Sequence, residues 1–467
     1  MISYTTVRAV TNAAAAFYGT FGFDSREPLE RTVARVDGWR REVVRPRRIP
    51  DEPGQPAAAL WRDQVVVSSN RFAALDLRIP SVDPAPYVAE PTVRSLRDWM
   101  AKHVKVVGPG LWQLPLDRQL TDPETVLAER NATRLDYIRT MCALLRGAGF
   151  EADVVFAAAD ADVPEALRRR NMYEKPNVRA FATALCRVTQ REGGFLGFGG
   201  EERVVFVGTE NQYAPVGPTA FEGSDYFDPE AGTFGVVTAP DASFAAFAGE
   251  ESEYLVREDG AVDLTVRNVT RGPAVGSFRK RYEEMLPEDR SRHHQALLGA
   301  VAQAASATSD LETDVSSYPA TRTFSCYVPD FATVQGDAIT IQVPPLVSTL
   351  PSLIGRSRQT PFEVGATEEE EEKVTIRFPE GYTEAESLPK PFVFAHPQKP
   401  SEVWLSSEVK SSVVDGRLVV ELVRRARRRP TTWFGPEVYE LVKDWGRVAG
   451  SRVNRTVTAR KPCQKRQ

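Results

Sequence analysis

Cysteine and histidine are both scarce in this sequence, whose 467 residues contain four of each. The cysteines stand far apart and form no C-x-x-C pair, which excludes a disulfide-dense framework; they are Cys142, Cys186, Cys326 and Cys463. The histidines show no metal-ligand spacing either, because the adjacent pair His293–His294 would point in different directions on a helix. We therefore expect no metal and no cofactor.

A long apolar run, a strong net charge and an export signal are also missing. No stretch reaches the ~18 consecutive apolar residues of a membrane-spanning helix, so no transmembrane segment is predicted. The net charge of -4 argues against a nucleic-acid binder. Within residues 1–17 the only basic residue, Arg8, interrupts the apolar stretch instead of preceding it, which does not fit a signal peptide.

What the sequence does contain is typical of a multidomain α+β protein. Its hydrophobic fraction of 42% and charged fraction of 26% are ordinary for globular proteins, and 467 residues are too many for a single core. Proline-rich breaks and changes of hydrophobic period predict four parts. These are a partial β-rich domain with a proline-rich connector at 1–86, an α+β domain at 87–222, a β-rich domain with inserted helices at 223–360, and a C-terminal β domain with a terminal helix at 361–467.

The central part reads as helices followed by strands. Apolar residues recur at helical spacing over 93–104 and again from Thr133, and Gly147 with Gly149 ends the second helix. Strands are predicted at 152–157, 181–188 and 203–207. A helix followed by antiparallel strands favours an α+β fold.

The pattern after residue 250 is mostly β. Hairpins are predicted around Asp259–Gly260 and Asp415–Gly416, and a helical stretch at 276–305 is broken at Pro287. The spacing of strands predicts two successive β-sandwich-like modules, mostly antiparallel, with a last helix from Pro436.

Two runs of like charge lie in the C-terminal part. The acidic run Glu368–Glu372 is interpreted as a solvated loop between strands. The basic run Arg424–Arg429 continues a strand and has two interpretations. It would bind an acidic protein, a lipid headgroup or a polyanion, or it would supply solvated edge-strand charges that discourage aggregation.

The stretch Asn131–Phe150 resembles the core helix of bacterial transglutaminase-like domains, which runs roughly G-D-C-K-D-K-A-x-L-L-x-A-L-L-R-A-x-G-I. Its tail, Ala-Leu-Leu-Arg-Gly-Ala-Gly-Phe, sets the register and places Asp136 on the family's aspartate. Further segments resemble the family in the same order, namely its first helix at 96–108, a turn at 122–130, the end of the domain at 211–217, and a trailing β domain at 378–382 with 388–389. The resemblance covers most of the chain and implies that residues 87–222 form a transglutaminase-like domain between uncharacterised β-rich domains.

This resemblance implies a papain-like fold, in which catalysis uses Cys, His and Asp. Here Arg134 occupies the Cys position, Thr183 the His position and Val207 the Asp position. Arginine is neither a nucleophile nor a base near neutral pH, and valine cannot orient an imidazole. The domain is therefore interpreted as a non-catalytic pseudoenzyme that binds a protein or peptide, or serves as a scaffold.

Two residues at the start of the core helix are the predicted binding residues. Arg134 would favour an acidic partner. Asp136 would bind a backbone or a cationic group, and the alternative role is to tie down the first turn of its own helix.

Two other functions remain open. Cys142 with His103 as its base would make a residual cysteine-dependent hydrolase or amide-transfer enzyme, although Cys142 lies on the apolar helix face and equally fits a buried, inert thiol. In the other alternative, the C-terminal β domains act as an envelope or assembly component.

The resemblance also bears on location and assembly. Relatives with this architecture begin with a complete N-terminal β domain behind a secretion signal, which implies the periplasm or the envelope. This sequence shows no such signal and starts partway into that domain. Two interpretations stay open: the sequence is a truncated form, or a partner supplies the missing strands. An incomplete sheet would leave an open edge that invites pairing, which under the second interpretation predicts an oligomer or a heteromeric partner.

Overall fold

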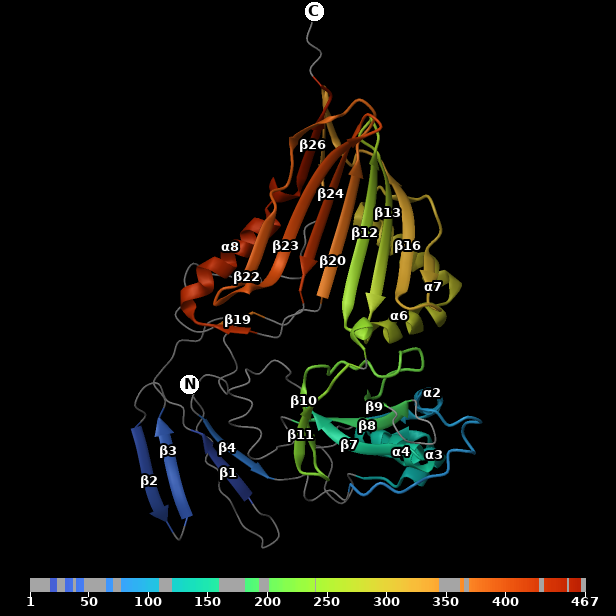
Figure 1. Cartoon of the computed structure of the whole chain (residues 1–467), viewed down its shortest axis with the longest axis vertical. Helices are drawn as coiled ribbons and strands as arrows, with labels where there is room; N and C mark the ends of the chain where they lie inside the picture. Colours follow the sequence, from blue (N-terminus) through green and yellow to red (C-terminus); the bar gives the residue numbers. More distant parts are fainter. Residues whose placement is uncertain are drawn as a thin grey trace, which may run out of the picture.

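A computed structural model shows a mixed α+β protein that is rich in strands and contains several sheets (Figure 1). It describes residues 77–108, 120–158, 181–192, 201–239, 241–343, 362–364, 369–427, 432–451 and 453–462. It also describes the backbone of four N-terminal strands: β1 (Phe17–Gly22), β2 (Glu30–Val36), β3 (Trp39–Arg45) and β4 (Gln64–Ser69). Strand β1 pairs with β4 and β2 pairs with β3, so the predicted domain at 1–86 does contain strands. Residues 46–56 of the predicted connector lie outside the described residues.

The central part is an antiparallel five-stranded sheet with helices packed on it. Its strand order is β11-β10-β7-β8-β9. The strands are β7 (Glu151–Ala157), β8 (Thr183–Glu192), β9 (Glu201–Val207), β10 (Asp225–Asp228) and β11 (Thr233–Val236). The helices are α2 (Val93–His103), α3 (Pro123–Glu129) and α4 (Arg134–Gly147), and the short strands β5 (Lys105–Val106) and β6 (Asn131–Ala132) pair in parallel. The predictions of both long helices and of three strands here are confirmed.

Helix α4 is the centre of this unit, and its start is fixed by its own residues. Thr133 is the N-cap, and its Oγ1 accepts from the Asp136 backbone N–H at 3.2 Å. The Asp136 carboxylate accepts from Thr133 Oγ1 and from the Thr121 N–H, both at 2.8 Å. All residues from Leu135 to Leu145 are buried, so the helix is enclosed and not merely laid on the sheet. Asp136 thus has the structural role that was one of its two predicted alternatives.

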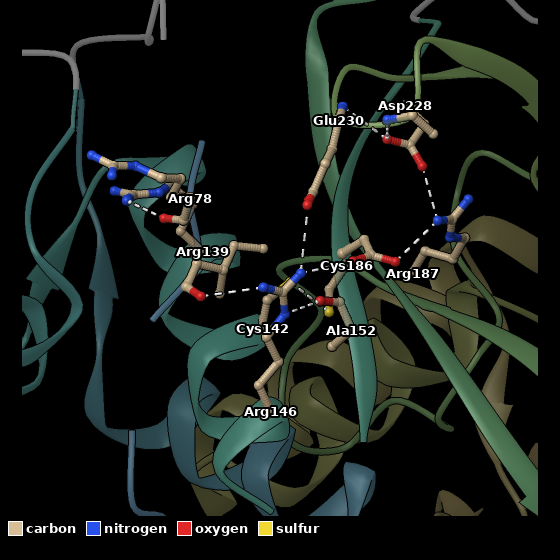
Figure 2. A network of polar contacts seen from close by, with 12 residues as sticks. Arg78, Arg139, Cys142, Arg146, Ala152, Cys186, Arg187, Asp228 and Glu230 are labelled. Carbon is tan, nitrogen blue, oxygen red and sulfur yellow. Dashed lines mark hydrogen bonds and ion pairs between the residues drawn. The ribbon is translucent and has the colours of Figure 1, made fainter. Parts of the chain in front are cut away.

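The C-terminal end of α4 is fastened to the sheet by charged side chains (Figure 2). Arg146 and Arg187 share one carboxylate, since their Nη2 atoms lie 2.8 and 3.0 Å from the two oxygens of Asp153. Arg187 also pairs with Asp228 at 2.8 Å, and Arg146 donates to the Ala152 carbonyl at 2.7 Å. These contacts join α4 to β7, β8 and β10, which sets the position of the helix over the sheet.

The C-terminal half is built on one large sheet that crosses the predicted domain boundary. Its strand order is β14-β16-β13-β12-β20-β24-β23-β22, with β15 paired to β16. The strands are β12 (Phe247–Val256), β13 (Val262–Arg271), β14 (Ser306–Ala307), β15 (Glu312–Asp314), β16 (Ala320–Val328), β20 (Glu369–Arg377), β22 (Phe392–His396), β23 (Lys399–Val414) and β24 (Arg417–Ala426). Because β12 and β20 pair in parallel, the predicted parts 223–360 and 361–467 share a single sheet, and the division at residue 360 does not separate two sandwiches.

A smaller sheet packs against this large one and closes a sandwich-like core. It has the order β17-β18-β26-β21, formed by β17 (Thr333–Gln335), β18 (Ala338–Gln342), β21 (Glu384–Ser387) and β26 (Thr456–Arg460). Ile341 and Val457 of the small sheet share one buried cluster with Leu264, Ile376 and Val420 of the large sheet. Residues from both predicted C-terminal parts therefore form one core.

Helices lie along the two edges of the large sheet, one group beside β13 and β16 and the other beside β22 and β23 (Figure 1). Helices α6 (Ala274–Glu283) and α7 (Pro287–Val301) lie near β13 and β16, and α7 begins at the predicted break. Helix α8 (Tyr439–Gly450), preceded by the 3₁₀ turn η6 (Pro436–Val438), packs on β22 and β23 together with β19 (Phe362–Val364) and β25 (Thr432–Phe434). Both predicted hairpins are confirmed, with positive φ at Gly260 and at Asp415–Gly416.

The acidic and basic runs pair with each other across the large sheet. The prediction of a solvated loop at Glu368–Glu372 is wrong, because Glu369 to Glu372 lie in β20 directly opposite the basic end of β24. Arg424 pairs with Glu372 at 3.0 Å, Arg425 with Glu371 at 2.6 Å and Arg427 with Glu369 at 2.8 Å. Cross-strand attraction outweighs the low strand propensity of glutamate, so much of the basic charge is neutralised within the protein.

Candidate functional site

The chain topology brings the three positions predicted from the resemblance to one end of the central sheet. Helix α4 turns back into β7 through three residues, and β7 is antiparallel to β8, so α4 and β8 run in the same direction. Arg134 begins α4, Thr183 begins β8, and Val207 ends β9, which is antiparallel to β8. The start of helix α4, the start of β8 and the end of β9 therefore lie at the same end of the central unit.

The three side chains have different surroundings. Arg134 is exposed on the first turn of α4, and the structure shows no ion pair to it from the described residues. Thr183 is half-buried and lies opposite Ala157 of β7. Val207 is buried and lies opposite Cys186 of β8, so its side chain belongs to the core and not to the surface.

A carboxylate that the sequence did not reveal lies just beyond the end of β9. Glu210 is half-buried, and its Oε2 accepts from the Gly208 N–H at 2.7 Å. Burial raises the pKa of this carboxyl, while that hydrogen bond and the positive charges of Arg97 and Arg134 act in the opposite direction. Glu210 thus follows the end of β9, three residues past the predicted Val207 position, and its charge interacts with that of Arg134 at the start of α4.

The Glu210 carboxylate folds back against Gly208. A Cβ at position 208 would lie 2.6 Å from Glu210 Oε1, so a larger residue there would require the carboxylate to shift. An acidic residue two positions after a glycine at a strand end was the available signal in the sequence. Glu210 was not predicted because the resemblance assigned the acid position to Val207, the last residue of β9.

Tyr137 adds an unsatisfied polar group at the same end. It lies one turn beyond Arg134 on α4, so the two side chains share a helix face. Its side chain is 1% exposed, and its hydroxyl has no hydrogen-bond partner within the described part of the chain. Burial raises the pKa of Tyr137, Arg97 lowers it and the charge of Glu210 raises it, which places all three groups in one electrostatic neighbourhood.

Arg97 of α2 connects this neighbourhood to the C-terminal half. Its guanidinium is buried, donates to the Ala214 carbonyl at 2.6 Å and pairs with Asp98 at 2.7 Å. From the other side, α6 contacts the same segment, since Arg279 donates to the Tyr213 carbonyl at 3.3 Å. Residues 213–215 are therefore held between the central sheet's helices and the C-terminal unit.

The structure does not bring Cys142 against His103. The Cys142 sulfur is fully buried and lies 2.8 Å from Cys186 Sγ (Figure 2). Burial raises the pKa of the Cys142 thiol well above its ordinary value, and the contact with Cys186 adds to this. His103 is exposed, its ring stacks on Trp99, and its Nδ1 lies 2.9 Å from the Trp99 carbonyl oxygen.

The described residues show neither a candidate metal site nor a candidate membrane-spanning helix. Within them, no group of three or more His, Cys, Asp or Glu side chains could hold a metal ion. No helix in the described ranges is both long and apolar enough to cross a membrane.

Comparisons with known proteins give little further guidance. No family model and no curated protein matches the chain. A crystal structure from Parabacteroides distasonis, described only provisionally as a protease, aligns with 96% of this chain and 70% of its own length, at 12% identity and a TM-score of 0.46. A similarity this low carries no argument about activity.

Proposed function

We propose that residues 87–222 form a degenerate transglutaminase-like domain that binds a carboxylate-bearing segment of a protein or peptide and performs no catalysis. The observation that carries the proposal is the exposed Arg134 guanidinium at the first residue of a fully packed helix, where the related enzymes place a cysteine. A cation at this end of a helix is unfavourable by about 0.3–1 kcal/mol, because it meets the positive end of the helix dipole. An anionic group bound there would relieve this repulsion and would pair with the guanidinium.

The surroundings of Arg134 support a binding role. Tyr137 is 1% exposed, and its buried hydroxyl has no hydrogen-bond partner in the described structure. Such a state is costly for a polar group unless a ligand or water supplies the missing hydrogen bond. Glu210 attracts Arg134 from nearby but forms no ion pair with it among the described contacts. A ligand carboxylate would compete with Glu210 for the same cation.

Cysteine catalysis receives no support from the geometry. A nucleophile needs a thiolate and a base within hydrogen-bond reach. Cys142 is enclosed in the core with its pKa raised, and its contact is another thiol. The alternative in which the C-terminal β domains act as an envelope or assembly component stays a prediction. Its test cannot be the removal of residues 361–467, since β20 and β24 are inner strands of the shared sheet and their removal would expose β12.

The test uses an array of synthetic hexapeptides made in pairs, one containing Asp or Glu and the other Asn or Gln. The full chain should bind a subset of the acidic members more tightly than their amide counterparts. Arg134→Glu should weaken that binding by about tenfold or more, since a charge-assisted hydrogen bond contributes about 1.5–3 kcal/mol.

Arg94→Glu is the matched control, because Arg94 is also exposed and also lies in the first turn of a helix, α2. Both variants place a carboxylate instead of a guanidinium near the positive end of a helix dipole, which is favourable in both helices. A general change in stability or net charge would therefore affect both variants. Equal binding by the Arg134 and Arg94 variants would sink the proposal.

A further inference from the structure

Two buried thiols from different elements meet inside the central domain. Cys142 lies on α4 and Cys186 in the middle of β8, 44 positions apart in sequence, and their sulfur atoms are 2.8 Å apart. Both side chains are 0% exposed. The separation is shorter than the ~3.5 Å at which even two carbon atoms make optimal contact, so an ordinary packing contact does not describe it.

The same distance excludes a metal ion between the two sulfurs. Thiolates that share a tetrahedral zinc lie about 3.7 Å apart, given Zn–S bonds of about 2.3 Å. The described residues also offer no third and fourth ligand near the pair. The neighbouring side chains in the core are apolar, among them Met141 and Val188.

We propose that Cys142 and Cys186 form a disulfide bond that ties α4 to β8. Closing the gap from 2.8 Å to the ~2.05 Å of a disulfide needs only a small adjustment of the two side chains. The oxidant would be an exchangeable disulfide, such as glutathione disulfide or a disulfide oxidoreductase. One thiolate attacks a sulfur of the oxidant and releases a thiol, and the second thiolate then attacks the mixed disulfide and releases the other. Overall, two thiols of the chain lose two electrons and two protons, and the oxidant becomes two thiols.

The burial of the pair determines when this reaction happens. A thiol that is enclosed and whose pKa is raised supplies little thiolate, and an oxidant cannot reach it. The bond therefore forms before α4 packs on the sheet, and packing afterwards shields it from reductants. Its place also matters, because α4 carries Arg134 at its first residue and the bond would fix that helix on β8 two turns further along.

The experiment refolds the full chain in a glutathione–glutathione disulfide buffer. It then unfolds the protein in denaturant with N-ethylmaleimide and maps the peptides by mass spectrometry before and after reduction. The Cys142 and Cys186 peptides should appear linked, about 2 Da lighter than the two thiol peptides together, and should carry no label until they are reduced. Cys326, a buried free thiol of β16, should label completely on unfolding and serves as the internal control.

Variants separate a disulfide from a mere thiol contact. Reductant added in denaturant should lower the midpoint of unfolding of the wild type and of Cys326→Ser, but not of Cys142→Ala or Cys186→Ala. Reduction of the wild type without denaturant should be slower than reduction with denaturant by about tenfold or more. Complete labelling of Cys142 and Cys186 in the unreduced wild type would overturn the proposal, and this readout does not depend on any variant folding.

Discussion

The buried ion pair between Arg424 and Glu372 gives the most quantitative prediction about the shared sheet. The two side chains are 6% and 13% exposed, and Arg424 Nε lies 3.0 Å from the Glu372 carboxylate. At that distance the attraction is about 5 kcal/mol for an effective dielectric constant of ~20. Burial nevertheless raises the pKa of Glu372 against the effect of Arg424, and it lowers the pKa of Arg424 against the effect of Glu372. Burial therefore acts against the charged form of both partners, and at Glu372 the charge of Glu250 acts in the same direction.

This balance predicts a particular pattern in a double-mutant cycle. Arg424→Leu should lower the free energy of unfolding by about 3–5 kcal/mol at pH 7, because it leaves Glu372 buried without its partner. The double variant Arg424→Leu/Glu372→Leu should be close to the wild type or more stable than it, since a buried pair often costs more than an apolar replacement. Urea unfolding followed by tryptophan fluorescence measures all three proteins.

The pH dependence of Arg424→Leu provides a second check. Glu372 has a folded-state pKa above its unfolded value, and losing Arg424 raises it further. Protonation of Glu372 then favours the folded state. The destabilisation caused by Arg424→Leu should therefore be greatest above the folded-state pKa of Glu372, and it should disappear as pH falls below the unfolded-state pKa of about 4.3. A destabilisation that stays constant down to that pH, or a double variant as unstable as Arg424→Leu, would refute the reasoning.

Two further predictions concern the α6 interface and a histidine of α7. Gly276→Ala should destabilise the folded protein by about 1–3 kcal/mol, because the new Cβ would lie 2.7 Å from Ala214 Cβ. Gly299→Ala is the control and should be neutral or stabilising, since a Cβ there would have nothing within 4 Å. Thermal unfolding measures both variants, and equal shifts in melting temperature would contradict the contact. Burial lowers the pKa of His293, and the charge of Arg322 adds to this, so the unfolded state binds the proton more tightly and stability should fall as pH drops through about 6.5. In His293→Gln, the free energy of unfolding in urea should fall less between pH 7.5 and pH 5.5 than it does in the wild type. An equal fall in both proteins would mean that other groups cause it.

Local signals in the sequence were sufficient for several elements of the fold. The apolar period predicted α2 and α4, Thr133 marked the start of α4, and Asp415–Gly416 marked a tight turn whose residues need positive φ. Each of these features depends on residues close together in the chain. Their prediction therefore did not require the tertiary structure.

Features that depend on distant residues could not be predicted in the same way. The parallel pairing of β12 with β20 has no turn residues to mark it, so the C-terminal half was divided where the sheet is continuous. The acidic run of β20 appeared unsuitable for a strand until the basic run of β24 lay opposite it. The Cys142–Cys186 contact likewise joins a helix to a strand that only the fold brings together.

The candidate site shows the same division. The sequence placed Arg134, Thr183 and Val207 by their resemblance to a family pattern, and the topology puts their backbones at one end of the sheet. It did not predict Glu210 or Tyr137, because their importance depends on burial and on the electric field of neighbouring charges. The carboxylate next to Arg134 became visible only with the folded-back conformation at Gly208.

The most direct measurement of the central claim is a double-mutant cycle between Arg134 and a ligand carboxylate. Arg134→Gln is combined with a Glu→Gln change in the tightest-binding acidic peptide, and affinities of all four combinations are measured by calorimetry. A direct pair predicts a coupling free energy of about 1–3 kcal/mol, so that either change alone removes most of the affinity that both remove together. Additive effects, with coupling near zero, would mean that Arg134 does not hold the carboxylate and would contradict the account.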